Sequence, residues 1–506
     1  MNLADVWAGH AGQSVTPVPV LSPIDGRVLH TLPQSSIEDV DDAFARARVA
    51  ARSWAQAGFA TRRAVLLRAH DLVLQRREEF IEVIRQETGK TRGQALEEVA
   101  IAASATRYNA LSARTVLRGR SRRAGLPFLT RTSVRYQPKG VVGVITPWNY
   151  PLSLAALDVI AALAAGNGVV QKADNQGAAS VLALRRAYID AGVPDALWSV
   201  VAGPATTVGE RVTDLADYIC FTGSTATGRL VAEKAGRRLV GASLELGGKN
   251  PLLVLDDVDP ERAAADTAYA CFAAMGQLCV SIERIYVLRP VADRYLDALI
   301  QTLREATIGS DGAADFGTLT TQAQLNRVRA HLDDAVAQGA EILVGGNARP
   351  DLGPFVFEPT LLRGVTPEMR CFSEETFGAI ASVYVVDSVQ EAIELANHTE
   401  YGLNAAVFSG NISRAREIAQ QLDAGTININ EGYRASFSAV DAPMGGTKQS
   451  GVGRRNGPEG LLRFVEPVTI AWTTGLLRLP TSAQAFERLG PLMLLLMRVL
   501  KALRIR

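Results

Sequence analysis

The 506-residue sequence contains few of the residues that build disulfide scaffolds or metal sites. Its four cysteines, Cys220, Cys271, Cys279 and Cys371, form no CxxC pair, so reduced thiols fit better than a disulfide framework. Its five histidines are scattered, with no HExxH motif and no Cys/His cluster, which gives a zinc site little support. We therefore predict no metal site and a reducing, cytoplasm-like compartment.

An excess of charge and a long apolar segment are also missing. Lys and Arg total 53 and Asp and Glu total 52, so the net charge of +1 does not favour nucleic acid as a partner. No apolar run reaches the roughly 18 residues of a membrane span. Residues 1–10 show no basic segment followed by an apolar one, so no signal peptide is expected there. The composition is that of an ordinary soluble globular protein.

Three common enzyme motifs are absent. There is no GxGxxG, because the glycines at 451, 453 and 457 have the wrong spacing. There is no P-loop, because Gly248-Lys249 is followed by Asn250. There is no GxSxG nucleophile elbow either. A dehydrogenase with the usual Rossmann fingerprint is therefore disfavoured.

The sequence does contain short apolar segments that alternate with helical ones. Ser36 precedes Glu38 and Asp39 as a helix start, and residues 152–163 form a buried helix that Gly166 would end. Strands are expected at 141–145, 168–172, 198–201 and 218–221, and the pattern restarts after Pro251 with strands at 252–255, 285–288 and 427–429. This alternation predicts parallel, doubly wound α/β sheets in two domains.

Four segments carry groups suited to chemistry. Residues 146–151 place Asn149 after a strand, and residues 221–228 place Gly223 and Ser224 between a strand and a helix, where backbone N–H groups can face an anion. Residues 245–249 place Glu245 before two glycines, and residues 276–279 end at Cys279. Taken singly, these are explained as a turn residue, an ordinary connection, a salt-bridged carboxylate and a buried thiol. Together, in this order, they are hard to explain as coincidence.

In this order the segments resemble the aldehyde dehydrogenase superfamily, from about residue 21 to residue 472. Residues 374–378, 397–403, 425–430 and 443–451 extend the match. The resemblance implies an aldehyde-dehydrogenase-like α/β fold with two Rossmann-like domains and a small β oligomerisation arm. The implied divisions are a dinucleotide-binding domain at 1–131 and 153–246, a catalytic domain at 247–440, an arm at 132–152 and 441–474, and an amphipathic extension at 475–506.

The resemblance also implies the mechanism. Cys279 would attack the aldehyde, and the Asn149 amide and the Cys279 N–H would stabilise the resulting oxyanion. Glu245 would then activate water to release a carboxylic acid, and a base useful near neutrality needs a raised pKa. Because a free thiol has a pKa of about 8.5, the site must favour the thiolate or deprotonate Cys279 locally.

By position, the residues that match family contacts to the dinucleotide are Thr146, Trp148, Lys172, Asn175, Gly223, Ser224, Leu246, Glu375 and Phe377. The family often has Glu where this chain has Asn175, and that Glu holds the ribose hydroxyls and repels a 2′-phosphate. A neutral Asn175 near Lys172 removes the repulsion. We therefore predict NADP as the cofactor, with NAD possible, although Asp174 would oppose this if it pointed inward.

The substrate remains open at this level. The segments around Asn149 and Cys279 resemble the bacterial NADP-dependent succinate-semialdehyde dehydrogenase subgroup. Well-studied members bind the substrate carboxylate with arginines at the positions of Leu157 and Ala273. An apolar pocket at these positions suits aliphatic or aromatic aldehydes instead.

Alternatives to an aldehyde-oxidising enzyme also exist. A non-catalytic structural homologue is disfavoured because Cys279, Glu245 and Asn149 are all retained. A phosphorylating or CoA-acylating relative generally lacks the base at Glu245. The resemblance further implies a homodimer or homotetramer.

The C-terminal extension has its own pattern. Leu492, Leu495, Leu496, Val499, Leu500 and Leu503 fall on one helical face, and Arg498, Lys501 and Arg504 lie opposite. About 15 residues after Pro491 are too few to span a bilayer. The pattern therefore predicts either peripheral contact with an anionic membrane or packing on a partner subunit.

Overall fold

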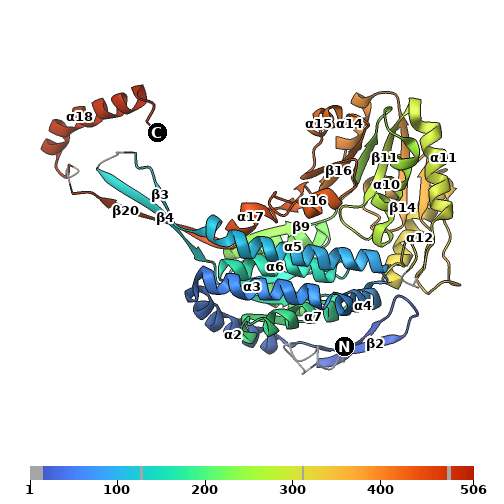
Figure 1. Cartoon of the computed structure of the whole chain (residues 1–506), viewed down its shortest axis with the longest axis horizontal. Helices are drawn as coiled ribbons and strands as arrows, with labels where there is room; N and C mark the ends of the chain where they lie inside the picture. Colours follow the sequence, from blue (N-terminus) through green and yellow to red (C-terminus); the bar gives the residue numbers. More distant parts are fainter. Residues whose placement is uncertain (1–14, 126–128, 310–312, 476–479, 506) are drawn as a thin grey trace.

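The computed structural model describes residues 15–125, 129–309, 313–475 and 480–505. Two large β-sheets, each covered by helices, form the body, and a β-arm with a terminal helix projects from it (Figure 1). The prediction that residues 1–10 contain no signal peptide concerns a segment outside the described residues.

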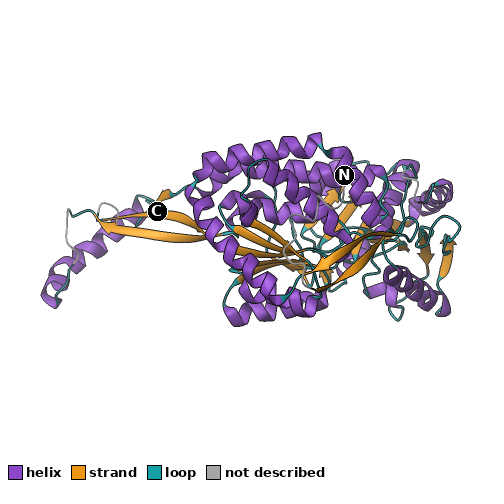
Figure 2. Cartoon of the chain, turned by 90° about the horizontal axis from the view of Figure 1, so that it is seen from below, coloured by secondary structure: helices purple, strands orange, loops and turns teal. Residues whose placement is uncertain are grey.

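The first sheet has six strands in the order β19-β9-β8-β5-β6-β7. The strands from β5 to β9 run parallel, and β19 is antiparallel to β9. Helices lie on both faces of the sheets (Figure 2), which explains why β5, β6, β7 and β8 are almost entirely buried. The bounds are β5 Val141–Ile145, β6 Gly168–Lys172, β7 Trp198–Val201, β8 Tyr218–Thr222, β9 Gly241–Glu245 and β19 Gly451–Val452.

The second sheet has seven strands in the order β12-β13-β14-β11-β10-β16-β17. All neighbouring pairs are parallel except β12 and β13. The restart of the strand pattern after Pro251 therefore corresponds to a second sheet, and the predicted α/β class is confirmed. The bounds are β10 Asn250–Val254, β11 Ile282–Leu288, β12 Glu341–Val344, β13 Thr360–Arg363, β14 Ile380–Val386, β16 Asn404–Phe408 and β17 Thr426–Ile429.

The helices follow the predicted signals at several termini. Ser36 caps α2 through a capping box with Asp39, and Gly166, in a left-handed conformation, ends α6. The main helices of the first domain are α2 Ile37–Gln56, α3 Gly58–Gln75, α4 Arg77–Thr88, α5 Arg92–Leu117, α6 Pro151–Ala165, α7 Ala178–Asp190, α8 Glu210–Leu215 and α9 Thr225–Arg238. Around the second sheet are α10 Pro260–Phe272, α11 Arg289–Glu305, α12 Gln322–Ala337, α13 Arg370–Ser373, α14 Val389–Asn397, α15 Ile412–Ala419 and α16 Arg434–Ser438. Helix α17 Gly457–Leu462 packs instead on α5 and α6 of the first domain.

The arm is a separate three-stranded sheet in the order β20-β4-β3. Its strands are β3 Arg120–Arg122, β4 Thr130–Pro138 and β20 Val465–Thr473, and smaller pairs are β1 Val15–Leu21 with β2 Val28–Gln34 and β15 Tyr401–Gly402 with β18 Thr447–Lys448. The arm boundaries differ from those expected. Residues 141–145 form β5 inside the six-stranded sheet, because their apolar side chains are buried on both faces. Residues 451–452 likewise join that sheet. Each of the two predicted arm segments, 132–152 and 441–474, therefore contributes fewer residues to the arm than expected.

The extension forms one helix, α18 Ala483–Ala502, at the far end of the arm (Figure 1). The helix begins earlier than expected, because Ser482 caps it through the N–H of Ala485, and Pro491 lies inside it. Its side chains include no buried residue. Among the described residues, no helix is both long enough and apolar enough to cross a membrane.

Candidate active site

The predicted site residues gather at one edge of the six-stranded sheet. Strands β5, β6, β8 and β9 run parallel, so their carboxyl ends meet at the same edge. Lys172 and Glu245 are the last residues of β6 and β9, and Asn149 and Gly223 follow β5 and β8 within a few residues. Ligands of open α/β sheets bind outside this edge.

Asn149 lies in the turn between β5 and α6 and is buried, with 4% of its surface exposed. Its side-chain nitrogen donates a hydrogen bond to the carbonyl of Gln277 at 2.8 Å. Because an amide nitrogen carries two hydrogens, one N–H remains for another acceptor. This bond brings the Asn149 side chain to the segment that leads to Cys279.

Cys279 follows a strained turn. Ala274 and Met275 have φ values of +49° and +56°, a left-handed conformation that these residues rarely adopt. A side chain at Gly276 would collide with the carbonyl of Gly378, at 2.2 Å from the added carbon. Of the four cysteines, all of them within the described residues, Cys279 alone is partly exposed. The thiol that follows this turn is therefore partly exposed, whereas the other three thiols are buried.

The surroundings of Cys279 favour the protonated thiol. Burial, followed by the nearby carboxyl groups of Glu375 and Glu245, raises the pKa of Cys279 to about 12, and Arg455 opposes this rise. The sequence left two routes to a nucleophile: a thiolate that is stable in the free enzyme, or deprotonation of the thiol during the reaction. The raised pKa favours the second route.

Glu245 ends β9 and is held by the antiparallel pairing of Gly451 with it. Its side chain is buried, and Oε1 has no hydrogen-bond partner among the described residues. Burial raises the pKa of Glu245 to about 7, while the Arg455 guanidinium acts in the opposite direction. A carboxyl group with this pKa can gain or lose a proton near neutrality.

One predicted cofactor residue, Lys172, lines a cavity of about 380 Å³ between β6, β8 and α9. Lys172 and Phe221 line it, together with Thr227 and Leu230 of α9. Ser224 caps α9 through the N–H of Thr227, so this helix begins beside the cavity. Burial lowers the pKa of Lys172, and the charge of Asp174 partly offsets this effect.

Asn175 lies in a short turn after β6. Its nitrogen donates to the Gln34 side chain at 3.3 Å, and its Oδ1 has no partner among the described residues. The Asp174 carboxylate instead accepts from the N–H of Gln176, so it caps the turn. Gln34, on β2, is a neighbour of this position that the sequence pattern did not indicate.

Among the remaining predicted cofactor residues, contacts join segments of the first and second domains. Trp148 packs edge-on against Phe377, with 5.8 Å between ring centroids, and Glu375 accepts the N–H of Gly248 at 2.9 Å. Burial and the charge of Glu283 raise the pKa of Glu375 to about 7. Leu246 is buried beside α9, and Thr146 accepts a hydrogen bond from Gln171 at 3.0 Å within the sheet.

Leu157 and Ala273 are buried in one apolar cluster that contacts Cys279. Other members of this cluster are Tyr150, Leu154, Leu278, Tyr433, Phe437 and Met444. The structure therefore brings together two positions that lie far apart in the sequence, in a cluster that packs against Cys279.

A buried charge cluster near Glu245 was not predicted. Asp158 of α6 accepts two hydrogen bonds from Arg455, at 2.9 and 2.6 Å, and one from Arg463 at 2.7 Å. All three groups are buried, and Arg455 also bonds to Thr222. No sequence signal links these residues, because Asp158 and the two arginines are separated by most of the chain.

Comparison with known proteins identifies the family. The model of the aldehyde dehydrogenase family matches residues 10–470. The chain belongs to this family. A relative from Mycolicibacterium smegmatis, provisionally named an NADP(+)-dependent succinate-semialdehyde dehydrogenase, is 48% identical over 90% of this chain and 88% of its own length. A 4,4′-diapolycopene aldehyde oxidase from a Methylomonas species is 35% identical over 90% of this chain and 86% of its own length.

Solved aldehyde dehydrogenase structures share the fold. Betaine aldehyde dehydrogenase from Staphylococcus aureus in complex with NAD+ superposes with a TM-score of 0.88 at 30% identity, over 95% of this chain and 99% of that one. An NAD-dependent aldehyde dehydrogenase from Sinorhizobium meliloti gives 0.88 at 32% identity, over 93% and 94%. The predicted family and the predicted fold are therefore confirmed.

Proposed function

We propose that this aldehyde dehydrogenase oxidises an apolar aldehyde to a carboxylic acid with NADP, through a covalent thioester on Cys279. The observation that carries this proposal is the convergence of the Asn149 amide, the Cys279 thiol and the Glu245 carboxyl group at the crevice, each from a different loop or strand. A structural homologue would need neither an unpaired, buried base nor a partly exposed thiol in a strained turn.

The reaction begins at the thiol. A water molecule takes the Cys279 proton, and the resulting thiolate forms a C–S bond to the aldehyde carbon while the carbonyl electrons move to oxygen. The second N–H of Asn149 and the backbone N–H of Cys279 would stabilise this oxyanion, and one such donor contributes about 3 kcal/mol. Collapse of the oxyanion with loss of the hydride leaves a thioester.

Glu245 would complete the cycle. Its carboxylate takes a proton from water, and the resulting hydroxide attacks the thioester and breaks the C–S bond. A pKa of about 7 suits this step, since the group is then partly ionised at neutral pH. The products are a carboxylic acid and the free thiol.

The cofactor is the hydride acceptor of this reaction. Its fit is supported by the cavity that Lys172 lines and by the unpartnered Oδ1 of Asn175, three residues further along the chain. Lys172 and the start of α9 would hold its phosphates, and Glu375 and Phe377 would lie along its path to Cys279. A neutral Asn175 favours NADP over NAD, and the named Mycolicibacterium relative supports the same choice.

The proposed substrate is apolar because of the cluster around Leu157 and Ala273. Two cations border this cluster, and each is paired: Lys90 with Glu98, and Arg434 with Glu431. A substrate carboxylate would therefore be buried without a free cation. Succinate semialdehyde is the second candidate, and the names of the mycobacterial relatives favour it.

Steady-state kinetics on three aldehydes distinguish these candidates. We expect kcat/KM for octanal and benzaldehyde to exceed that for succinate semialdehyde by at least tenfold. The opposite order would overturn the apolar assignment, whereas absence of NADPH formation with every aldehyde would overturn the proposed reaction.

We also propose that α18 contacts an anionic membrane surface. Exposed apolar residues crowd this helix, including Leu492, Leu494, Leu495, Met497 and Val499. After Glu487 the charges of α18 are all basic, at Arg488, Arg498 and Lys501, and Arg504 follows the helix. A helix with an apolar face and basic flanks lies in the headgroup region of anionic bilayers.

Association into a homodimer or homotetramer through the arm is a further proposal that rests on the exposed edges of β3 and β20.

A further inference from the structure

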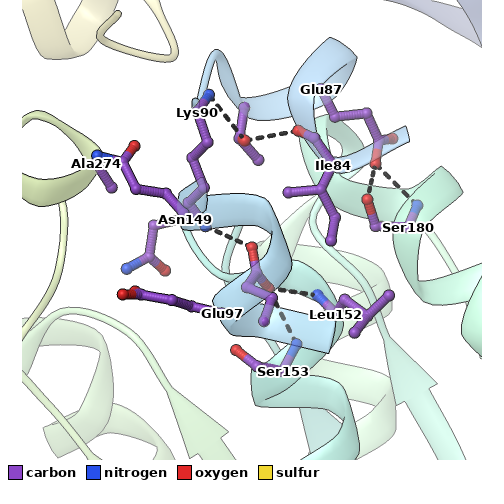
Figure 3. A network of polar contacts seen from close by, with 12 residues as sticks. Ile84, Glu87, Lys90, Glu97, Asn149, Leu152, Ser153, Ser180 and Ala274 are labelled. Carbon is purple, nitrogen blue, oxygen red and sulfur yellow. Dashed lines mark hydrogen bonds and ion pairs between the residues drawn. The ribbon is translucent and has the colours of Figure 1, made fainter. Parts of the chain in front are cut away.

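A buried ion pair lies directly behind the Asn149 turn. Lys90, just after α4, is 4% exposed, and Glu98, on α5, is fully buried. Their side chains form an ion pair, and the contacts around Lys90 and Asn149 are drawn in Figure 3. Removing two charges from water is costly, so such a pair is stable only when its remaining hydrogen-bonding groups are satisfied.

The second oxygen of Glu98 completes the start of α6. It accepts the N–H groups of Leu152 and Ser153, each at 3.0 Å (Figure 3). Tyr150 occupies the N-cap of α6 but makes no side-chain capping bond, and Pro151 has no N–H. Glu98 therefore acts as the cap of α6, and it is supplied from a different helix.

The ammonium group of Lys90 contacts the residue next to Asn149. It lies 3.3 Å from the centre of the Tyr150 ring, a cation–π contact. The ion pair thus holds both Tyr150 and the first turn of α6. Since Asn149 directly precedes Tyr150, the position of its side chain depends on this contact.

The acceptor of Asn149 is fixed from the same corner of the molecule. Gln277, whose carbonyl accepts from Asn149, receives the N–H of Thr320 on its own side chain at 3.0 Å. The Thr320 hydroxyl in turn donates to the carbonyl of Thr88 at 2.8 Å. Thr88 ends α4, two residues before Lys90. The turn of Asn149 and the segment of Cys279 are thus both anchored to residues 88–98.

We propose that Lys90 and Glu98 are positioning residues for the oxyanion step: they fix the Asn149 amide relative to Cys279. This inference rests on the proposed function, in which Asn149 donates to the oxyanion. A displacement of about 1 Å in a reacting group can lower a rate by up to about a hundredfold. Loss of the pair therefore lowers the rate of the step that Asn149 assists and has little effect on cofactor binding.

The first test compares two buried carboxylates that cap helices. Glu98→Gln removes the charge under α6, and Glu87→Gln does the same under α7, where Glu87 accepts the N–H groups of Ala179 and Ser180 at 2.8 Å. With the purified full-length chain, we expect Glu98→Gln to lower kcat by ten- to a hundredfold with KM for octanal changed less than threefold. Glu87→Gln should keep kcat within threefold at saturating NADP, although its melting temperature also falls.

A double-mutant cycle shows whether Glu98 acts through Asn149. In an Asn149→Ala background, Glu98→Gln should lower kcat by less than threefold, because the group that it positions is already gone. Should Glu98→Gln fold poorly, Lys90→Met combined with Glu98→Gln removes both charges and leaves no unpaired one.

The outcomes separate the two proposals. An unchanged kcat in Glu98→Gln, or an equal loss of kcat with and without Asn149, would make the pair purely structural and overturn this inference. An unchanged kcat in Asn149→Ala would instead overturn the role of Asn149 in the proposed function.

Discussion

The crevice and the arm of this molecule depart from ordinary burial in opposite ways. At the carboxyl edge of the first sheet, Glu245 and Lys172 are ionisable groups withdrawn from water. On α18 beyond the arm, leucines and methionines are exposed to it. Each arrangement costs free energy in the isolated chain, and each becomes favourable when something else binds. The comparison therefore contrasts buried ionisable groups, which we propose bind small molecules, with exposed apolar groups, which we propose bind a membrane surface.

The largest effect is expected at the thiol. Cys279→Ser should lower kcat by at least a thousandfold, because a hydroxyl of similar size is a far weaker nucleophile at neutral pH. NADPH formation from octanal, followed by absorbance, measures this. Cys271→Ser is the matched control, since that thiol is buried beneath the second sheet and should leave kcat within threefold. Undiminished NADPH formation in Cys279→Ser would contradict the assignment.

The next effect separates the base from the nucleophile. Glu245→Gln should still form the thioester, so a rapid burst of one NADPH per active site is expected. Steady-state turnover should then fall by about a hundredfold or more, because no carboxylate activates water. Rapid-quench or stopped-flow measurement detects the burst. Loss of both phases together would place Glu245 in the first step instead.

The pH dependence follows from the same carboxyl group. Its pKa is raised to about 7, so the ionised base predominates above pH 7 and is lost as pH falls. The rate of thioester hydrolysis should fall about tenfold for each unit below pH 7 and level off above it. Single-turnover hydrolysis measured between pH 5.5 and 9 tests this. A rate that stays constant down to pH 5.5 would show that burial does not perturb the base.

A smaller effect is expected at the cofactor. Asn175→Glu places a carboxylate where a 2′-phosphate is expected, so the ratio of kcat/KM for NADP to that for NAD should fall by at least tenfold. Asn175→Gln, which is similar in size and neutral, should change the ratio by less than threefold. Equal shifts in both variants would show that size, and not charge, determines the preference.

The smallest effect on catalysis is expected from the tail. A chain ending at Thr474 should keep kcat within twofold and lose binding to vesicles that contain anionic lipid, because the apolar and basic residues of α18 are gone. Co-sedimentation with phosphatidylserine-containing and neutral vesicles measures this. Unchanged vesicle binding would exclude the membrane contact, and a loss of oligomer size would favour packing on a partner subunit.

The fold could be predicted from the sequence because its strands are short, β-branched and bounded by turns. The runs at 141–145 and 168–172 became β5 and β6, and the glycine after residue 165 ended α6 as expected. The place of β5 within the sheet could not be predicted, because strand order depends on packing between distant segments. That is why part of the predicted arm lies inside the body.

The candidate site residues could be predicted from the order of the motifs, but the environment of these residues could not. A helical pattern alone puts Glu98 among the ordinary charged residues of α5, yet it is fully buried. Likewise, Asp158 looks like an interruption of an apolar helix, and its partners Arg455 and Arg463 lie near the end of the chain. Burial and pairing of charges are properties of the packed molecule, so no local pattern announces them.

The pairing of Glu245 with Gly451 has a consequence for synthesis of the protein. The ribosome completes the Cys279 segment well before it makes the strand that flanks Glu245. A product released early, before residue 451, would carry the thiol without the finished frame around the base. The frame around the predicted base is therefore complete only after residue 451 has been synthesised.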